Sequence, residues 1–179
     1  MFGFTGHTVA ISFGPLTTDR TSVGYRIGGT DWVFANVTAG TTHLFVDDKF
    51  FRAVVNETEV PPGEPQTFEL RVANWDCGVQ IDQVHVQEGE RIVQVPNYDR
   101  AIEFIGDSLS AGMYQTHESL SSFAFDVGAG FGDTEYAVIA YPGICAADHE
   151  CCNNTRGQAH QWFYTSDTSE RASRIWGGR

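Results

Sequence analysis

Apolar and polar positions alternate along the first half of the chain, and turn-forming residues separate the alternating runs. Phe68, Leu70 and Val72 alternate with Glu69 and Arg71, as in a strand that is buried on one face only. The same pattern predicts strands at residues 8–13, 22–27, 31–36, 42–46, 50–56, 66–73 and 79–87. Short strands at this spacing, with no helical stripe between them, predict an antiparallel jelly-roll β-sandwich over residues 1–92.

The pattern changes in the second half, where residues 93–179 are predicted to form another domain. Residues 92–98 are expected to be an extended linker, followed by near-continuous apolar strands at 101–105 and 135–141. Between the two strands, residues 119–127 predict a helix. Strand, helix and strand in this order predict the βαβ unit of a parallel sheet, whose ligands bind at the carboxyl ends of the strands.

The predicted helix has an apolar face and a capping residue. Leu120, Phe123, Ala124 and Val127 recur at helical spacing, and Ser119 is the expected N-cap.

Composition and charge narrow the class of protein. The chain has 179 residues, of which 41% are hydrophobic and 19% charged, as in a globular protein. A net charge of −12 argues against a nucleic-acid partner or an anionic membrane surface. No stretch reaches the roughly 18 apolar residues of a membrane span, and the first residues do not have the pattern of a signal peptide.

Cysteines and glycosylation sequons favour an extracellular location. The chain has four cysteines, at positions Cys77, Cys145, Cys151 and Cys152. Their spacing fits no CxxC-type zinc pattern. Three Asn-X-Thr sequons predict glycosylation at Asn36, Asn56 and Asn153. An even number of cysteines together with sequons is typical of an oxidising, secretory compartment. A disulfide is expected among Cys145, Cys151 and Cys152, whereas Cys77 is either free or part of the pairing.

The candidate chemistry lies where the strand at 101–105 ends. Gly106, Asp107 and Ser108 follow the strand directly, so a hydroxyl stands at a glycine-hinged turn. A serine needs a base and a nearby set of N–H donors to act as a nucleophile. The plainer interpretation is that Asp107 and Ser108 only cap the following turn.

Residues 100–112 resemble the first block of the SGNH, or GDSL, hydrolases, and the whole chain resembles carbohydrate esterase family 2. The segments Phe4–Val9 and Leu44–Asp48 resemble the early strand and a turn of the family's jelly roll. The resemblance implies Ser108 as nucleophile, with the N–H groups of Ser108 and Gly143 forming the oxyanion hole.

The aromatic residues Trp162 and Tyr164 are weaker candidates. They fall in a loop that resembles one of the family's, and aromatic rings there could stack on sugar faces. An ordinary core cluster is the competing interpretation.

The catalytic base that the family uses has no counterpart here. The family's Gly-x-Asn-Asp and Asp-x-x-His blocks are absent after Ser108, and the Asp82-x-x-His85 sequence falls within a predicted strand of the first domain. His117, His149 and His160 follow Ser108, but a surface histidine is the simpler interpretation of each. The expected explanation is truncation, with a missing C-terminal segment or a second chain completing the sheet.

The resemblance therefore implies a secreted serine esterase that removes acetyl groups from plant cell-wall polysaccharides such as xylan or glucomannan. It implies no metal and no organic cofactor, and it leaves the isolated chain inactive for want of a histidine. The alternatives are a carbohydrate-binding or interaction module without catalysis, and hydrolysis of lipid or acyl-thioester substrates.

Overall fold

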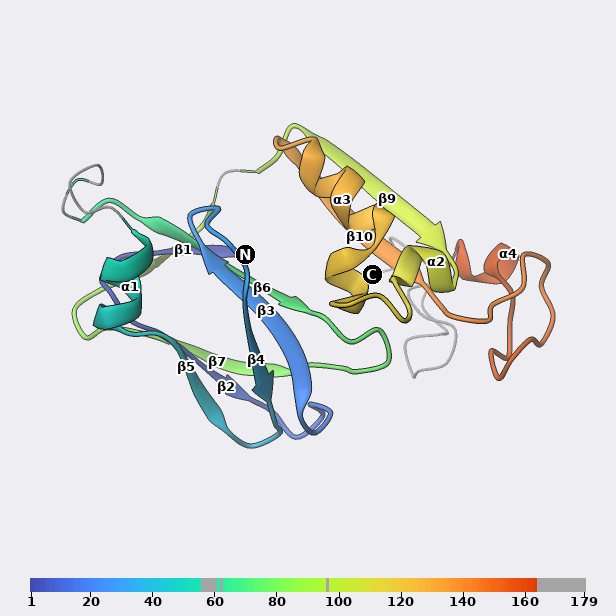
Figure 1. Cartoon of the computed structure of the whole chain (residues 1–179), viewed down its shortest axis with the longest axis horizontal. Helices are drawn as coiled ribbons and strands as arrows, with labels where there is room; N and C mark the ends of the chain where they lie inside the picture. The colour runs from blue at the N-terminus through green and yellow to red at the C-terminus, as the bar shows by residue number, and fades with distance from the viewer. Residues whose placement is uncertain (56–60, 62, 96, 164–179) are drawn as a thin grey trace. The chain divides into compact units, whose positions relative to one another are not determined.

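The computed structural model describes residues 1–55, 61, 63–95 and 97–163. Within them the chain divides into two compact units, residues 1–97 and 98–179 (Figure 1). The first unit contains β1 (Phe2–Phe4), β2 (Val9–Phe13), β3 (Thr21–Ile27), β4 (Val33–Val37), β5 (Thr42–Val46), α1 (Asp48–Val54), β6 (Gln66–Val72), β7 (Ile81–Val86) and β8 (Ile92–Val93). The second contains β9 (Arg100–Gly106), α2 (Ser108–Ala111), a 3-10 turn η1 (Glu118–Ser121), α3 (Phe123–Gly130), β10 (Thr134–Ala140) and α4 (Gln158–Gln161).

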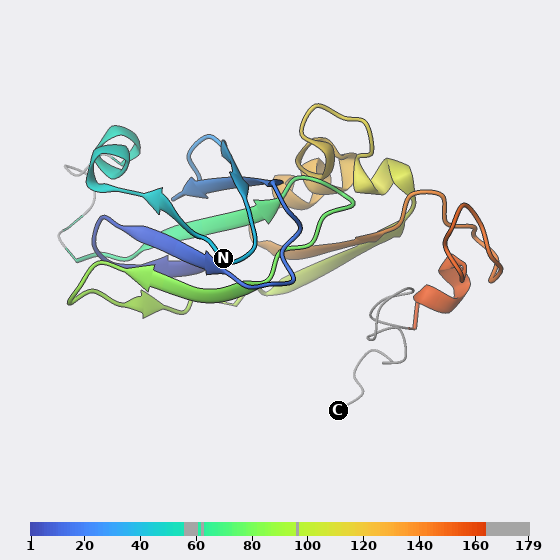
Figure 2. The same cartoon turned by 90° about the horizontal axis from the view of Figure 1, so that it is seen from below.

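The first unit is built from two antiparallel sheets. One has the strand order β4-β3-β6-β1-β8 and the other the order β5-β2-β7. Figure 2 shows the strands of this unit in layers. The alternation read from the sequence is confirmed for β2, where Val9, Ile11 and Phe13 are buried between the sheets. Two antiparallel sheets are thus found, whereas the jelly-roll assignment stays a prediction.

The core of the first unit is rich in aromatic rings. Phe68 is fully buried, and its ring lies 5.3 Å from that of Phe2, 5.8 Å from that of Phe45 and 6.2 Å from that of Tyr25. Aromatic pairs at these separations add to the stabilisation from burial alone. The two sheets are therefore held by one continuous apolar cluster.

The strand predicted at residues 50–56 is wrong over its described part, because Asp48–Val54 form a helix. Asp47 is the N-cap, and its carboxylate accepts a hydrogen bond of 2.6 Å from the Phe50 amide. Arg52 pairs with Asp48 one turn away, at 3.0 Å. Phe51 is the buried residue of this helix, so the apolar run does not alternate between two faces as a strand does.

The boundary segment also differs from the prediction. Part of the expected linker, Ile92–Val93, is a short strand that pairs with β1, so it belongs to the first unit. Gly3 lies so close to Val93 that a Cβ at that position would collide with the Val93 side chain.

The second unit is centred on two parallel strands. β9 and β10 pair in register from Thr134–Arg100 to Ala140–Gly106, which confirms the predicted parallel pair. Figure 2 shows α2 and α3 on one face of this pair. α3 approaches closely through Gly128, where a Cβ would collide with the Tyr136 ring.

The single helix predicted at residues 119–127 is wrong in its boundaries. A 3-10 turn ends at Ser121, and α3 begins at Phe123. Ser122 rather than Ser119 is the N-cap, since its hydroxyl accepts from the Phe125 amide at 3.1 Å.

The predicted apolar face is also only half buried. Leu120 and Ala124 are buried, whereas Phe123 and Val127 are 53% and 44% exposed. Gly128 lets α3 come close to β10, and rings at the start of the helix also pack on the strands. Phe123 lies edge-on to Phe104 at 6.4 Å, and Phe125 to Tyr136 at 6.0 Å.

No helix among the residues that the model describes is both long and apolar enough to cross a lipid bilayer.

Candidate active site

The candidate nucleophile lies at the start of the short helix that follows β9. Asp107 is the N-cap of α2, and its carboxylate accepts a hydrogen bond of 3.0 Å from the Leu109 amide. Ser108 is therefore the first residue of the helix and is partly exposed. Asp107 has the capping role that the plainer interpretation proposed, but Ser108 does not cap the turn.

Two glycines allow this compact turn. A Cβ at Gly106 would collide with the Ser110 side chain, so only glycine permits α2 to fold back against the end of β9. Gly112 ends the helix with a φ of 72°, in the left-handed region that favours glycine. The chain thus leaves β9, turns through Ser108 and closes again within a few residues.

Gly143 follows the neighbouring strand in a tight turn. The Ile144 amide donates to the Tyr141 carbonyl at 3.1 Å, and Gly143 has a φ of 80°. Proline at the second position and a positive φ at the third are the signature of a type II turn. Pro142 and Gly143 therefore form a type II turn directly after β10.

The register of the two strands relates these two turns. Gly106 pairs with Ala140, and the Tyr141 amide extends the ladder with a hydrogen bond of 3.2 Å to the Gly106 carbonyl. Ser108 and Gly143 therefore both follow at the carboxyl edge of the parallel pair. This edge is where open α/β sheets bind ligands.

A disulfide-closed loop comes after Gly143. Cys145 and Cys151 form the disulfide, with 5.7 Å between their Cα atoms, which confirms that one is present among the three cysteines. Cys152 is an exposed free cysteine. A Cβ at Gly143 would lie 2.6 Å from the Cys152 Cβ, so the loop packs directly on the glycine turn.

Asn154 fixes the loop to the turn. Its side-chain amide is almost completely buried and donates to the Pro142 carbonyl at 3.0 Å and to the Cys151 carbonyl at 3.3 Å. Sequence reasoning missed this residue, because it was noticed only as part of a sequon whose glycosylation position is Asn153.

An ion pair closes the base of the same loop. Asp148 pairs with Arg156, with 2.8 Å between Arg156 Nε and Asp148 Oδ1. The hydrogen bonds from Arg156, and a further one from the Gly157 amide, hold the pKa of the Asp148 carboxyl well below its usual range.

All six histidines lie in the described part of the chain, and of the three in the second unit none is hydrogen-bonded to Ser108 within that part. His149 lies beside the disulfide, His117 precedes η1 and His160 lies in α4. His85, in the Asp82-x-x-His85 sequence, lies on β7, where its Nε2 atom is 2.8 Å from Ser12 Oγ.

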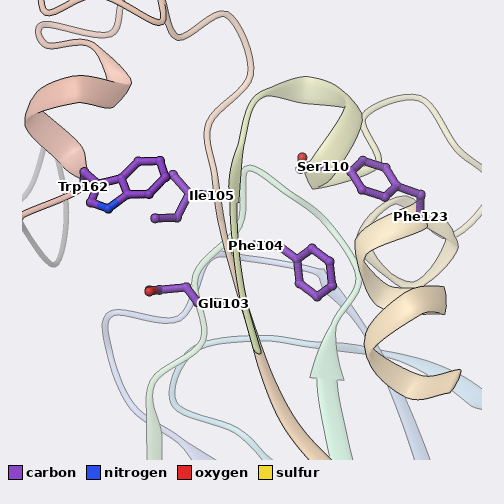
Figure 3. Close-up of a pocket in the computed structure, with 6 residues that line it drawn as sticks. All are labelled: Glu103, Phe104, Ile105, Ser110, Phe123 and Trp162. Atoms are coloured by element: carbon purple, nitrogen blue, oxygen red, sulfur yellow. The ribbon is translucent and has the colours of Figure 1, made fainter. Parts of the chain in front are cut away.

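A cavity of about 440 Å³ borders β9 but does not include Ser108 (Figure 3). Its lining residues are Glu103, Phe104, Ile105, Ser110, Phe123 and Trp162. Figure 3 shows Phe104, Ser110 and Phe123 on one side of the strand, and Trp162 beside Ile105 on the other. Trp162 is 58% exposed. Tyr164, the other aromatic residue predicted to bind sugar, lies outside the described residues.

The predicted glycosylation positions differ in what can be said of them. Asn36 on β4 and Asn153 in the disulfide loop are both exposed. Asn56 lies outside the described residues.

No protein-family model and no curated protein sequence matches the chain. Solved structures do. A carbohydrate esterase family 2 enzyme of Clostridium thermocellum, in complex with cellohexaose, is 16% identical with a TM-score of 0.69 over 94% of this chain. A family 2 enzyme of Corynascus thermopiles (Myceliophthora fergusii), with a carbohydrate-binding domain, is 17% identical with a TM-score of 0.66 over 96% of this chain. The acetyl xylan esterase Est2A of Butyrivibrio proteoclasticus is 18% identical with a TM-score of 0.56 over 81% of this chain.

The match covers only part of each of these proteins. The chain spans 52%, 53% and 41% of their respective lengths. Over about half of the length of the known enzymes, this chain has the fold of carbohydrate esterase family 2.

Proposed function

We propose that this chain is the nucleophile-bearing part of a secreted serine esterase that removes acetyl groups from plant cell-wall polysaccharides such as xylan or glucomannan. The observation that carries the proposal is the shared edge of β9 and β10, at which Ser108 and the Gly143 turn both follow their strands. The fold of carbohydrate esterases supports it, and one of the similar structures is an acetyl xylan esterase.

Ser108 Oγ would attack the acetyl carbonyl carbon, and the carbonyl oxygen would become an oxyanion. The N–H groups of Ser108 and Gly143 would donate hydrogen bonds to this oxygen. Removing one such donor in a serine hydrolase typically lowers kcat about 100–1,000-fold. A base must accept the hydroxyl proton and return a proton to the departing sugar alcohol.

In this proposal the catalytic base that accepts the Ser108 proton is not part of this chain. None of the three histidines of the second unit, all of them in the described ranges, is hydrogen-bonded to Ser108. The isolated chain is therefore expected to be inactive, and a C-terminal segment or a second chain would supply the histidine.

The test compares the chain alone with the chain extended by the coding region that follows Arg179. Both are incubated with 4-nitrophenyl acetate and with acetylated xylan, and released acetate is measured. The extended protein is expected to hydrolyse both, and Ser108→Ala is expected to abolish the activity. Hydrolysis by the chain alone, lost in Ser108→Ala, would overturn the assignment of an external base.

Ser12→Ala is the matched control, because Ser12 forms the serine–histidine hydrogen bond found in the first unit. Its activity is expected to equal that of the unsubstituted protein. Loss of esterase activity in Ser12→Ala, with full activity in Ser108→Ala, would place the nucleophile in the first unit and overturn the assignment of Ser108.

A carbohydrate-binding module is the second candidate function. It is favoured by the lack of a histidine on Ser108 in the described structure and by the cellohexaose complex of a similar protein. In this case the extended protein binds xylan or cello-oligosaccharides in calorimetry and releases no acetate.

A further inference from the structure

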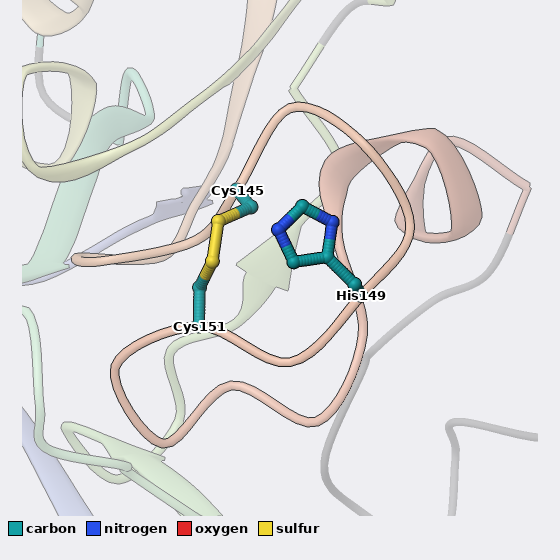
Figure 4. Close-up of side chains that lie close together, drawn as sticks. All are labelled: Cys145, His149 and Cys151. Carbon is teal, nitrogen blue, oxygen red and sulfur yellow. A yellow bond between two sulfur atoms is a disulfide. The ribbon is translucent and has the colours of Figure 1, made fainter.

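The loop after Gly143 brings together three side chains that ligate soft metal ions. The ligand atoms of Cys145, His149 and Cys151 all lie within 4.8 Å of one another. Figure 4 shows the imidazole of His149 beside the bond that joins the two sulfur atoms. We propose that the reduced form of this loop is a three-ligand Zn²⁺ site. In the disulfide form the two sulfur atoms are bonded to each other and cannot bind the metal as thiolates.

The ligand set and its spacing suit zinc. Two thiolates and an imidazole are among the preferred ligands of Zn²⁺, with Zn–S near 2.3 Å and Zn–N near 2.0–2.1 Å. Tetrahedral coordination at these lengths separates the ligand atoms by about 3.3–3.8 Å. After reduction the two sulfur atoms must therefore move apart from bonding distance, while the imidazole nitrogen already lies within 4.8 Å of both. His149 is exposed, so its ring has room to adjust.

The loop is also held in shape by contacts other than the disulfide. Cys151 and Asn154 exchange backbone hydrogen bonds of 3.0 and 2.8 Å. On the opposite side, the Gln158 amide donates to the Cys145 carbonyl at 2.8 Å. These hydrogen bonds do not involve the sulfur atoms, so we expect them to hold both cysteine backbones in place when the disulfide is reduced.

Two other possible ligands lie next to the cluster in the sequence, and neither is expected to bind the metal ion. Asp148 precedes His149 but is engaged by Arg156, so its carboxylate is already paired. Cys152 is not one of the three residues whose ligand atoms come together, and its sulfur would lie 3.5 Å from a Cβ at Gly143. The fourth zinc position is then left to water or another small ligand, as in open zinc sites.

The chemistry is balanced with a phosphine reductant. The phosphine is oxidised to its oxide and takes the oxygen of one water molecule, while the disulfide is reduced and each sulfur receives a proton. Zn²⁺ then replaces the two thiol protons, which pass to the buffer, and a lone pair of the imidazole completes the third bond.

The experiment measures metal binding by the whole chain in its two redox states. The chain is reduced with tris(2-carboxyethyl)phosphine without oxygen and titrated with Co²⁺, and bound Zn²⁺ is measured by native mass spectrometry and by competition with a chromogenic chelator. The reduced chain is expected to bind one metal ion with thiolate-to-cobalt charge-transfer absorption. The oxidised chain is expected to bind none at this site. Absence of binding by the reduced, folded chain would overturn the proposal, as would equal binding by the oxidised chain.

Variants separate the ligands from their neighbours. His149→Gln and Cys145→Ser are each expected to weaken zinc binding by more than about tenfold, which is the loss typical of merely perturbing a group behind a ligand. Cys152→Ser and His117→Gln are the matched controls and are expected to bind like the unsubstituted chain. Loss of binding in Cys152→Ser, or no effect of His149→Gln, would contradict the assignment. Far-ultraviolet circular dichroism of each variant confirms that a loss of binding is not a loss of folding.

Discussion

Different interactions stabilise the interior of each of the two units of this chain. In the first, two sheets enclose apolar side chains from nearly every strand, and rings such as Phe4, Phe45 and Phe68 are almost entirely buried. In the second, the parallel pair is only partly covered, and Val138 in the middle of β10 is 39% exposed. Its folding relies instead on glycines at close approaches, on capping side chains and on one disulfide. The difference shows that local constraints shape the edge at which Ser108 and Gly143 lie, whereas the first unit is stabilised by burial.

The largest expected effect tests the core of the first unit. Phe68→Ala removes a fully buried ring that contacts three others, so the free energy of unfolding of this unit should fall by about 3–5 kcal/mol. Val138→Ala in β10 is the comparison and should cost less than about 1 kcal/mol, because its side chain is partly in solvent. Urea denaturation with hydrogen-exchange mass spectrometry reports on each unit. Equal losses would remove the contrast between them.

The second prediction tests the glycine contacts of the second unit. Gly112→Ala places a methyl group against the Glu118 carbonyl oxygen at a residue with positive φ, so it should destabilise the unit by about 1–3 kcal/mol. Gly130→Ala is the matched control, since nothing lies within 4 Å of a Cβ there and the residue is helical. It should be neutral or stabilising by up to about 1 kcal/mol. Thermal unfolding of both variants gives the comparison, and a cost for Gly130→Ala that matches Gly112→Ala would refute it.

The third prediction concerns the cap of α3. Ser122→Ala removes an acceptor for the Phe125 amide from a buried position and should cost about 1 kcal/mol. Ser119→Ala should cost less, because the Ser119 side chain does not cap this helix. Amide exchange at the start of α3 measures the difference. The reverse order of the two variants would restore the helix boundary expected from the sequence.

The smallest effect is a pH dependence in the first unit. Burial lowers the pKa of His43 below its ordinary value, so the unfolded chain takes up a proton at a higher pH than the folded chain does. Stability should therefore rise with pH through the range just below the unfolded histidine pKa of about 6.5 and level off above it. His43→Gln should remove this part of the slope. Melting temperatures between about pH 5 and pH 7 test it, and an unchanged slope would contradict the role of His43.

Much of the fold could be read from the sequence because the strands carry a period of two. β2, β3, β5 and β6 were expected within a residue or two, as was the pair β9 and β10. The helix Asp48–Val54 was missed because adjacent phenylalanines hid a helical spacing, although Asp47 and Arg52 mark its two ends. β8 was missed because two residues carry no measurable period, and its pairing with β1 joins segments that are distant in the sequence.

The candidate site divides in the same way between local and distant information. Asp107, Ser108 and the Pro142-Gly143 turn could be located because their signals are contained in a few adjacent residues. The pairing of Cys145 with Cys151, and the hydrogen bonds of Asn154 to Pro142 and Cys151, depend on how the loop folds back. The cluster of Cys145, His149 and Cys151 cannot be recognised from the sequence for the same reason, because a CxxC-type spacing does not include His149.

The in-register pairing of β9 with β10 has a consequence for how this protein could be altered. The starting points of the two turns are fixed one strand spacing apart, about 4.8 Å, by the ladder itself. The segment between Gly112 and η1 takes no part in that ladder, and Tyr114 within it is 87% exposed. A reporter peptide inserted beside Tyr114 should therefore leave the pairing of β9 with β10 unchanged, which makes this exposed position a natural place for insertions during evolution or protein engineering.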